Sequence, residues 1–193
     1  GNGLLESQRP WLKGLSGHAL LEAWWEEAQS TSDNYKNADP KSRLNWVGPN
    51  MSARSSITAR QMETWAHGQE IFDILGEIRV ESDRIKNLAH LGVFTFSWTF
   101  KNRCLSTPKD PPFVQLESPS GINWEWNEPS RKSYVKGSAV DFASVVTQTR
   151  NILDTSLIVQ GETATRWMAF AQCFAGPPED PPQQNTRFTV DPK

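Results

Sequence analysis

The residues with the clearest chemical potential are a carboxylate and an imidazole, Glu63 and His67, four positions apart in the stretch 59–71. Residues at positions i and i+4 lie one above the other on the same face of an α-helix. A Glu-x-x-x-His pair on one face therefore offers a carboxylate oxygen and an imidazole nitrogen to one divalent metal ion. An exposed charge pair, or a satisfied polar contact, is the alternative interpretation of the same spacing.

Histidine is scarce in this chain, which limits the ligand sets that can be built. Only His18 and His90 accompany His67. His90 falls in an almost wholly apolar helical stretch, where it is either a hydrogen-bonded core residue or a third ligand turned inward. His18, in the first turn of an earlier helix, favours a solvated position. Cys104 and Cys173 lie far apart without a C-x-x-C motif, so we expect reduced thiols.

Three amphipathic segments must position these side chains. Apolar residues at three- and four-residue intervals, with Ser and Gly as start and stop signals, predict helices over about 17–37, 53–75 and 83–103. The polar face of the second helix holds Arg60, Glu63, His67 and Glu70. That face is either a solvated surface or an inward-facing site, as in helix bundles whose ligands project from facing helices. Arg60 and Glu70 are candidates for orienting the Glu63–His67 pair.

The hydrophobic period changes from 3.6 to 2 after a proline-rich linker at 106–112. The pattern beyond it predicts a β-hairpin over 113–127, a third strand at 134–136, a helix at 139–149, a strand at 156–160 and a helix at 162–175. We therefore expect an α+β protein with a helical domain at 1–105 and a small α+β domain at 113–176. The tail, 177–193, is too polar and proline-rich to pack well.

Composition excludes several classes of function. The chain has 193 residues, with 20 basic and 22 acidic side chains, so it lacks the net charge of a typical nucleic-acid binder. No apolar run approaches the ~20 residues that span a bilayer, and no signal peptide is visible, so we expect a cytoplasmic protein. No glycine-rich phosphate loop, nucleophile elbow or His-Glu-x-x-His motif is present.

The segment Met62-Glu63-Thr64-Trp65-Ala66-His67-Gly68 resembles the metal-binding helix of DinB-like bundle proteins, and more closely that of the mycothiol-dependent maleylpyruvate isomerase group. Two further stretches are similar to an uncharacterised bacterial metal-binding subgroup, Ala89-His90-Leu91-Gly92-Val93 and Phe174-Ala175-Gly176-Pro177-Pro178. Some members of that subgroup carry a wyosine-base-formation label. The resemblance runs from about 15 to 178. It implies a DinB-like four-helix bundle, incomplete at its N-terminus, followed by the isomerase group's C-terminal domain.

The resemblance also implies a ligand set. In that family, a carboxylate and a histidine in this spacing bind a divalent metal together with a histidine from an earlier helix. Glu63 and His67 match the motif, with zinc or nickel as the metal, whereas the helices that carry the third ligand are missing from this chain. His90 is the substitute ligand that we consider. Arg150 resembles a catalytic arginine that meets an acidic substrate, and its alternative role is that of a cation at a helix C-terminus.

The partners implied are a low-molecular-weight thiol such as mycothiol and a small electrophilic substrate, and the implied reaction is thiol-dependent transfer or isomerisation. The oligomeric state is open, with a homodimer as one alternative. A non-catalytic module that binds a metal or a small ligand is the second hypothesis. Modification of the wyosine base of tRNA is the third, and the balanced charge disfavours it.

Overall fold

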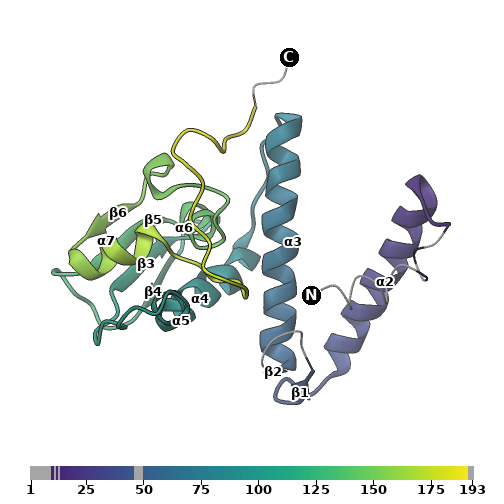
Figure 1. Cartoon of the computed structure of the whole chain (residues 1–193), viewed down its shortest axis with the longest axis horizontal. Helices are drawn as coiled ribbons and strands as arrows, with labels where there is room; N and C mark the ends of the chain where they lie inside the picture. The colour runs from purple at the N-terminus through teal and green to yellow at the C-terminus, as the bar shows by residue number, and fades with distance from the viewer. Residues whose placement is uncertain (1–9, 11, 13, 46–49, 191–193) are drawn as a thin grey trace. The chain divides into compact units, whose positions relative to one another are not determined.

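The computed structural model describes residues 10, 12, 14–45 and 50–190 and divides the chain into two compact units, residues 1–54 and 55–193. The first unit contains α2 (Gly17–Asn37) and a two-stranded antiparallel sheet of β1 (Arg43–Leu44) and β2 (Met51–Ser52) (Figure 1). The predicted helix at 17–37 is confirmed. Within its own unit α2 buries none of its side chains.

The second unit begins within the first turn of α3 (Ala53–Leu75), whose bounds agree with the predicted second helix. Met62 and Trp65 are buried on one face of α3, because their apolar side chains recur at a three-residue interval. The helix ends at Gly76, whose φ of 71° is left-handed, and the Glu77 amide donates to the Phe72 carbonyl. This six-to-one hydrogen bond is the Schellman termination that the glycine predicts.

The third predicted helix is interrupted. A short 3-10 turn (Asp83–Ile85) leads into α4 (Lys86–Phe94), and α5 (Phe96–Asn102) follows after a break at Thr95. The Thr95 hydroxyl donates to the carbonyls of Leu91 and Gly92 at 2.8 and 3.0 Å. A threonine hydroxyl that bonds the preceding turn competes with the helical pattern and bends the helix there. The apolar periodicity gave no sign of this break.

Four strands form the second sheet, in the order β4-β3-β5-β6. They are β3 (Phe113–Glu117), β4 (Asn123–Trp126), β5 (Tyr134–Ser138) and β6 (Ile158–Gln160). The hairpin of β3 and β4 is antiparallel, as predicted, with Val114 opposite Trp126. The strand β5 pairs with β3 in parallel, which the alternation of residues could not indicate.

The helices α6 (Ala139–Val146) and α7 (Glu162–Ala169) occupy the predicted places but are shorter than expected. Trp167 of α7 joins them to α5, since its ring centroid lies 5.2 Å from that of Phe96 and 5.7 Å from that of Phe142. The α+β class is therefore confirmed, with the helical part first and the sheet part second. Since α3, α4 and α5 share one core with the sheet, the helical segment at 55–105 belongs to the same compact unit as residues 113–176.

The proline-rich tail is mostly exposed, yet polar groups attach it to the second unit. Its backbone is held by the side chain of Gln172, which donates to the Pro177 carbonyl, and by Asn151, which donates to that of Pro182. In Figure 1 the yellow segment runs past α6 toward the C-terminal end of α3, where the Val190 amide donates to the Asp73 carbonyl at 2.8 Å. Composition alone predicted none of these contacts. No helix among the described residues has the length and apolar character needed to cross a membrane.

The contact between α4 and α6 yields a stability prediction. A Cβ at Gly92 would lie 2.8 Å from Val146 Cγ2 and 3.0 Å from Phe142 Cε1, closer than side chains pack. We expect Gly92→Ala to lower the free energy of unfolding by roughly 1–3 kcal/mol, because overpacking forces the two helices apart. Urea denaturation followed by circular dichroism measures the change.

The matched control is Gly68→Ala in α3. The nearest atom to its added Cβ is Arg79 Nη1 at 3.5 Å, an ordinary contact. This variant should be neutral or stabilised by up to about 1 kcal/mol, since alanine favours a helix. Equal effects at the two glycines would contradict the packing described for α4 and α6.

Candidate functional site

Glu63 and His67 lie on one exposed face of α3, as their spacing predicts. The Glu63 Oε2 to His67 Nε2 distance is 3.6 Å, and the side chains are 51% and 75% exposed. Arg79 fixes this part of the helix, since its Nη1 donates to the Trp65 carbonyl at 2.8 Å. The Trp65 indole in turn donates to Glu81 at 2.9 Å. The Glu63–His67 pair therefore lies on a helix whose opposite face is packed into the core.

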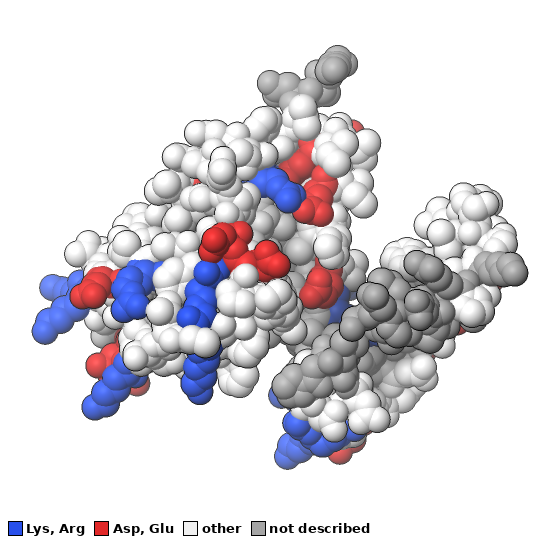
Figure 2. Space-filling view, in the orientation of Figure 1, with Lys and Arg blue, Asp and Glu red and all other residues white. Residues whose placement is uncertain are grey.

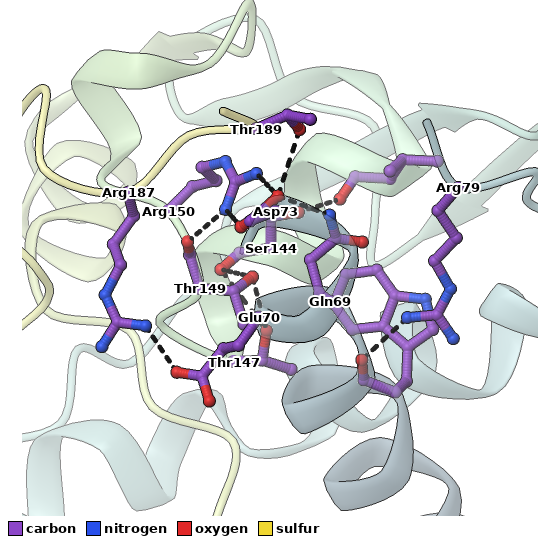
Figure 3. A network of polar contacts seen from close by, with 12 residues as sticks. Gln69, Glu70, Asp73, Arg79, Ser144, Thr147, Thr149, Arg150, Arg187 and Thr189 are labelled. Carbon is purple, nitrogen blue, oxygen red and sulfur yellow. Dashed lines mark hydrogen bonds and ion pairs between the residues drawn. The ribbon is translucent and has the colours of Figure 1, made fainter. Parts of the chain in front are cut away.

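The second nitrogen of His67 faces another carboxylate. Glu70 Oε2 lies 3.5 Å from His67 Nδ1, and the other oxygen, Oε1, accepts a hydrogen bond from Arg187 in the C-terminal tail (Figure 3). That hydrogen bond holds the pKa of Glu70 below its usual value, with a smaller contribution from His67, although partial burial acts in the opposite direction. The sequence suggested Glu70 as an orienting residue but gave no sign of Arg187.

These positions allow a test of whether the residues fit a metal ion. Glu63 and Glu70 approach opposite nitrogens of one imidazole, so an ion on Nε2 can use Glu63 but not Glu70. Among the described residues, no cluster of three or more His, Cys, Asp and Glu side chains is suited to a metal. Glu63 and His67 therefore offer at most two ligands to one ion, a carboxylate oxygen and an imidazole nitrogen, and a tight site needs at least one more.

His90, the predicted third ligand, is placed differently from the first two. It is exposed on α4, where its Nδ1 accepts a hydrogen bond from the Trp126 indole at 3.3 Å. Its ring also stacks on Phe94, with the centroids 6.2 Å apart. The structure does not bring His90 into one ligand cluster with Glu63 and His67. His18 pairs with Glu22 on α2, at 3.2 Å, and is exposed as expected.

Arg150, the predicted catalytic arginine, is held by a carboxylate of this chain. Its Nη1 and Nη2 donate to the two oxygens of Asp73 at 2.7 and 2.6 Å, in a fork that leaves the side chains only 16% and 10% exposed. Nη1 also donates to the Thr149 carbonyl. A substrate carboxylate would have to displace Asp73 in order to bind Arg150. In this structure the Asp73–Arg150 ion pair joins α3 to the segment after α6.

Asp73 is the centre of a larger polar network (Figure 3). Its Oδ1 also accepts from Gln69 at 3.0 Å and from the Thr189 hydroxyl at 3.1 Å. Burial acts to raise the pKa of Asp73, but the hydrogen bonds from Arg150, Gln69 and Thr189 and the charge of Arg150 outweigh it, and the pKa lies below its usual value. Sequence analysis missed Asp73, because its main partners lie 77 and 116 residues away along the chain.

The two cysteines are free thiols, as predicted. Cys173 is buried, and burial raises its pKa far above the usual value, with a further increase from the negative charge of Glu63. A thiol that stays protonated is a poor metal ligand and a poor nucleophile. Cys173 therefore adds nothing to the chemistry of the Glu63–His67 pair.

Comparison with known proteins gives a family match for the part of the chain that contains most of α3. A model of the mycothiol maleylpyruvate isomerase N-terminal domain matches residues 4–72, which include Glu63 and His67. Two uncharacterized proteins, from two strains of Mycobacterium tuberculosis, are each 39% identical over 176 residues, covering 91% of this chain and 68% of their own length. No solved structure shows a significant match.

The Asp73–Arg150 ion pair yields the second prediction. We expect Arg150→Met to lower the free energy of unfolding by about 3 kcal/mol, because Asp73 is left as a largely buried charge without its cation. Arg131→Met, at an exposed position in the segment between β4 and β5, is the control and should stay within about 0.5 kcal/mol of the parent. Denaturant titration at neutral pH gives both values, and equal stability of the two variants would contradict a structural role for Arg150.

The lowered pKa of Asp73 yields the third prediction, on pH dependence. A carboxylate with a depressed folded-state pKa adds stability above its unfolded-state value of about 3.9 and loses that contribution as the pH falls through the folded-state value. The stability difference between the parent and Asp73→Asn should therefore be largest near neutral pH and shrink below about pH 4. A difference that stays constant from neutral to acid pH would show that the Asp73 charge makes no contribution to folding.

Proposed function

This chain belongs to the family of mycothiol maleylpyruvate isomerase N-terminal domains, and on that premise we propose that Glu63 and His67 are two ligands of a divalent metal site that serves a thiol-dependent reaction. The observation that carries the proposal is the placement of a carboxylate and an imidazole Nε2 on the same exposed face of α3. The reaction class is transfer to, or isomerisation of, a small electrophilic molecule.

The donor set supports zinc, with nickel as the alternative, because one imidazole nitrogen and one carboxylate oxygen suit both ions. When bound, a divalent ion supplies Lewis acidity that lowers the pKa of a coordinated thiol toward neutrality. Glu63 and His67 are both accessible from solvent, since each side chain is at least half exposed. A thiol cosubstrate can therefore reach this face of α3.

The other residues of the network act on the position of α3. Arg79 and Trp65 hold the middle of the helix, and Arg150 holds its C-terminal end through Asp73. Arg150 thus enters the proposal as a positioning residue, and a direct role toward an acidic substrate requires it to exchange Asp73 for that substrate. His90 would complete the ligand set only by leaving its hydrogen bond with Trp126.

Two other functions make different demands on the chain. A non-catalytic metal- or ligand-binding module requires the same two ligands but shows no thiol-dependent turnover. A tRNA-modifying protein requires a basic surface with salt-sensitive RNA affinity. On the face of the second unit drawn in Figure 2, acidic and basic side chains are interspersed and do not form a single basic stripe. The charge distribution on this face gives no support to tRNA binding.

The fourth prediction concerns metal content. We expect the purified full-length protein to bind near-stoichiometric zinc or nickel after reconstitution, and Glu63→Ala and His67→Ala to lose at least tenfold in affinity. Thr64→Ala, an exposed neighbour on α3, is the matched control and should keep the metal. Elemental mass spectrometry and competition with a chromophoric chelator measure content and affinity.

Turnover of a small electrophile that needs both the metal and a low-molecular-weight thiol would establish the enzymatic form of the proposal. Metal binding without such turnover would favour the binding module. Absence of metal from a folded and reconstituted parent would refute the proposal and reduce Glu63 and His67 to an exposed ion pair.

A further inference from the structure

The first half of the tail, residues 177–185, lies along side chains of the second unit that bind its backbone. Gln172, which is only 1% exposed, donates from Nε2 to the Pro177 carbonyl at 3.0 Å and accepts at Oε1 from the Glu179 amide at 2.9 Å. The Glu179 carbonyl also accepts from Gln148 Nε2 at 2.8 Å. We call the residues whose side chains bind this backbone the tail-binding surface: Arg103, Gln148, Asn151, Asp154 and Gln172.

The chemistry of the tail-binding surface matches a proline-rich segment. Proline has a carbonyl but no N–H, so such a segment presents mainly hydrogen-bond acceptors. The surface supplies mainly donors, as where Asn151 Nδ2 donates to the Pro182 carbonyl at 2.7 Å. Its acceptor groups meet residues other than proline, as where the Asn185 amide donates to both oxygens of Asp154 at 3.0 Å. Extended proline-rich segments are a recurring class of peptide ligand, because their stiffness lowers the entropy lost on binding.

Two ion pairs determine which sequence fits this surface and in which register. Asp180 Oδ1 lies 2.9 Å from Arg103 Nη1, and further along the tail Arg187 Nη1 donates to Glu70 Oε1 (Figure 3). An acid and then a base of the tail therefore face a base and then an acid of the folded unit. Complementary charges favour the matching segment and disfavour others. The best ligand for the surface is thus a segment with the sequence of this tail.

One glycine allows the tail to fold back onto its own chain. Gly176, directly before the first proline of the tail, has a φ of 129°, which residues with a side chain rarely adopt. Among the described residues, none but its chain neighbours lies within 4 Å of the Cβ that another residue would add there. The backbone angle, and not packing, is therefore what distinguishes this position. A different φ at Gly176 would direct the tail away from its own chain.

We propose that the tail-binding surface also accepts the tail of a second copy of this chain, so that two molecules exchange tails and form a symmetric dimer. Each surface then makes with its partner's tail the contacts that it makes with its own tail in the monomer. The tail of the same chain competes at an effective concentration on the order of 1 mM, as short linkers give. Dimers of the parent chain therefore form in substantial amounts only when the protein concentration approaches that value.

The first test mixes two charge-reversed full-length chains, Arg103→Glu and Asp180→Arg. Each variant alone brings like charges together at this contact, in its monomer and in a dimer with its own kind. An exchanged heterodimer has opposite charges at both contacts, one of them native and the other reversed. We expect the mixture to dimerise with a Kd roughly tenfold below that of either variant alone, because two exposed pairs each contribute modestly. Sedimentation velocity measures these constants.

The control carries both substitutions, Arg103→Glu and Asp180→Arg, in one chain. Its tail again matches its own surface, so this chain should be as monomeric as the parent. A mixture of the two single variants that dimerises no more than each variant does alone would overturn the proposal. Heterodimers in the mixture, with a monomeric double variant, would support it.

The second test changes the hinge and does not depend on the folding of Arg103→Glu. Proline fixes φ near about −65°, so Gly176→Pro cannot keep the turn that returns the tail to its own chain. We expect its dimer Kd to lie at least about tenfold below that of the parent, because the competing tail of the same chain is withdrawn. In this background Gln148→Ala should weaken the dimer, since it removes a donor to the tail.

Gln183→Ala in the Gly176→Pro background is the matched control, because this exposed amide belongs to the tail and its side chain makes none of the contacts described above. It should leave the dimer unchanged. A Gly176→Pro chain that stays monomeric up to about 1 mM would overturn the proposal. A Gly176→Pro dimer that responds equally to Gln148→Ala and Gln183→Ala would also overturn it, because the interface would then lie elsewhere.

Discussion

The ion pair between Asp73 and Arg150 is the interaction on which the arrangement of the second unit depends. A bidentate carboxylate–guanidinium contact with little solvent access has strict geometry, so it fixes both the distance and the rotation of the two segments that it joins. It connects the last turns of α3 to the chain that follows α6. The same carboxylate accepts Thr189 from the tail, so three segments distant in sequence converge on one side chain.

The helix α3 serves two purposes because its faces differ. Met62 and Trp65 anchor it in the core, whereas Glu63 and His67 remain in solvent. An exposed pair of this kind contributes little to stability, typically less than about 1 kcal/mol. A rigid helix does hold the two side chains in fixed relative positions, which is what the proposed metal site requires.

The tail shows how polar contacts can order a segment that buries little apolar surface. Its prolines restrict the conformations of the unfolded chain, which lowers the entropy lost when the segment attaches. Side chains of the folded unit then bind its backbone at intervals, as Gln172 and Asn151 do. The end of the tail is held in a position where Arg187 donates a hydrogen bond to Glu70.

The sequence by itself determined the local features of this protein. Apolar periodicity located α2 and α3, the change of period located the hairpin, and four-residue spacing placed Glu63 and His67 on one face, since each of these depends on neighbours along the chain. Tertiary structure decided the rest. The parallel pairing of β5 with β3 and the partners of Asp73 and Glu70 all depend on residues brought together from distant positions. Arg150 illustrates the difference, because its charge was evident in the sequence, but only the folded chain shows that Asp73 already occupies its guanidinium.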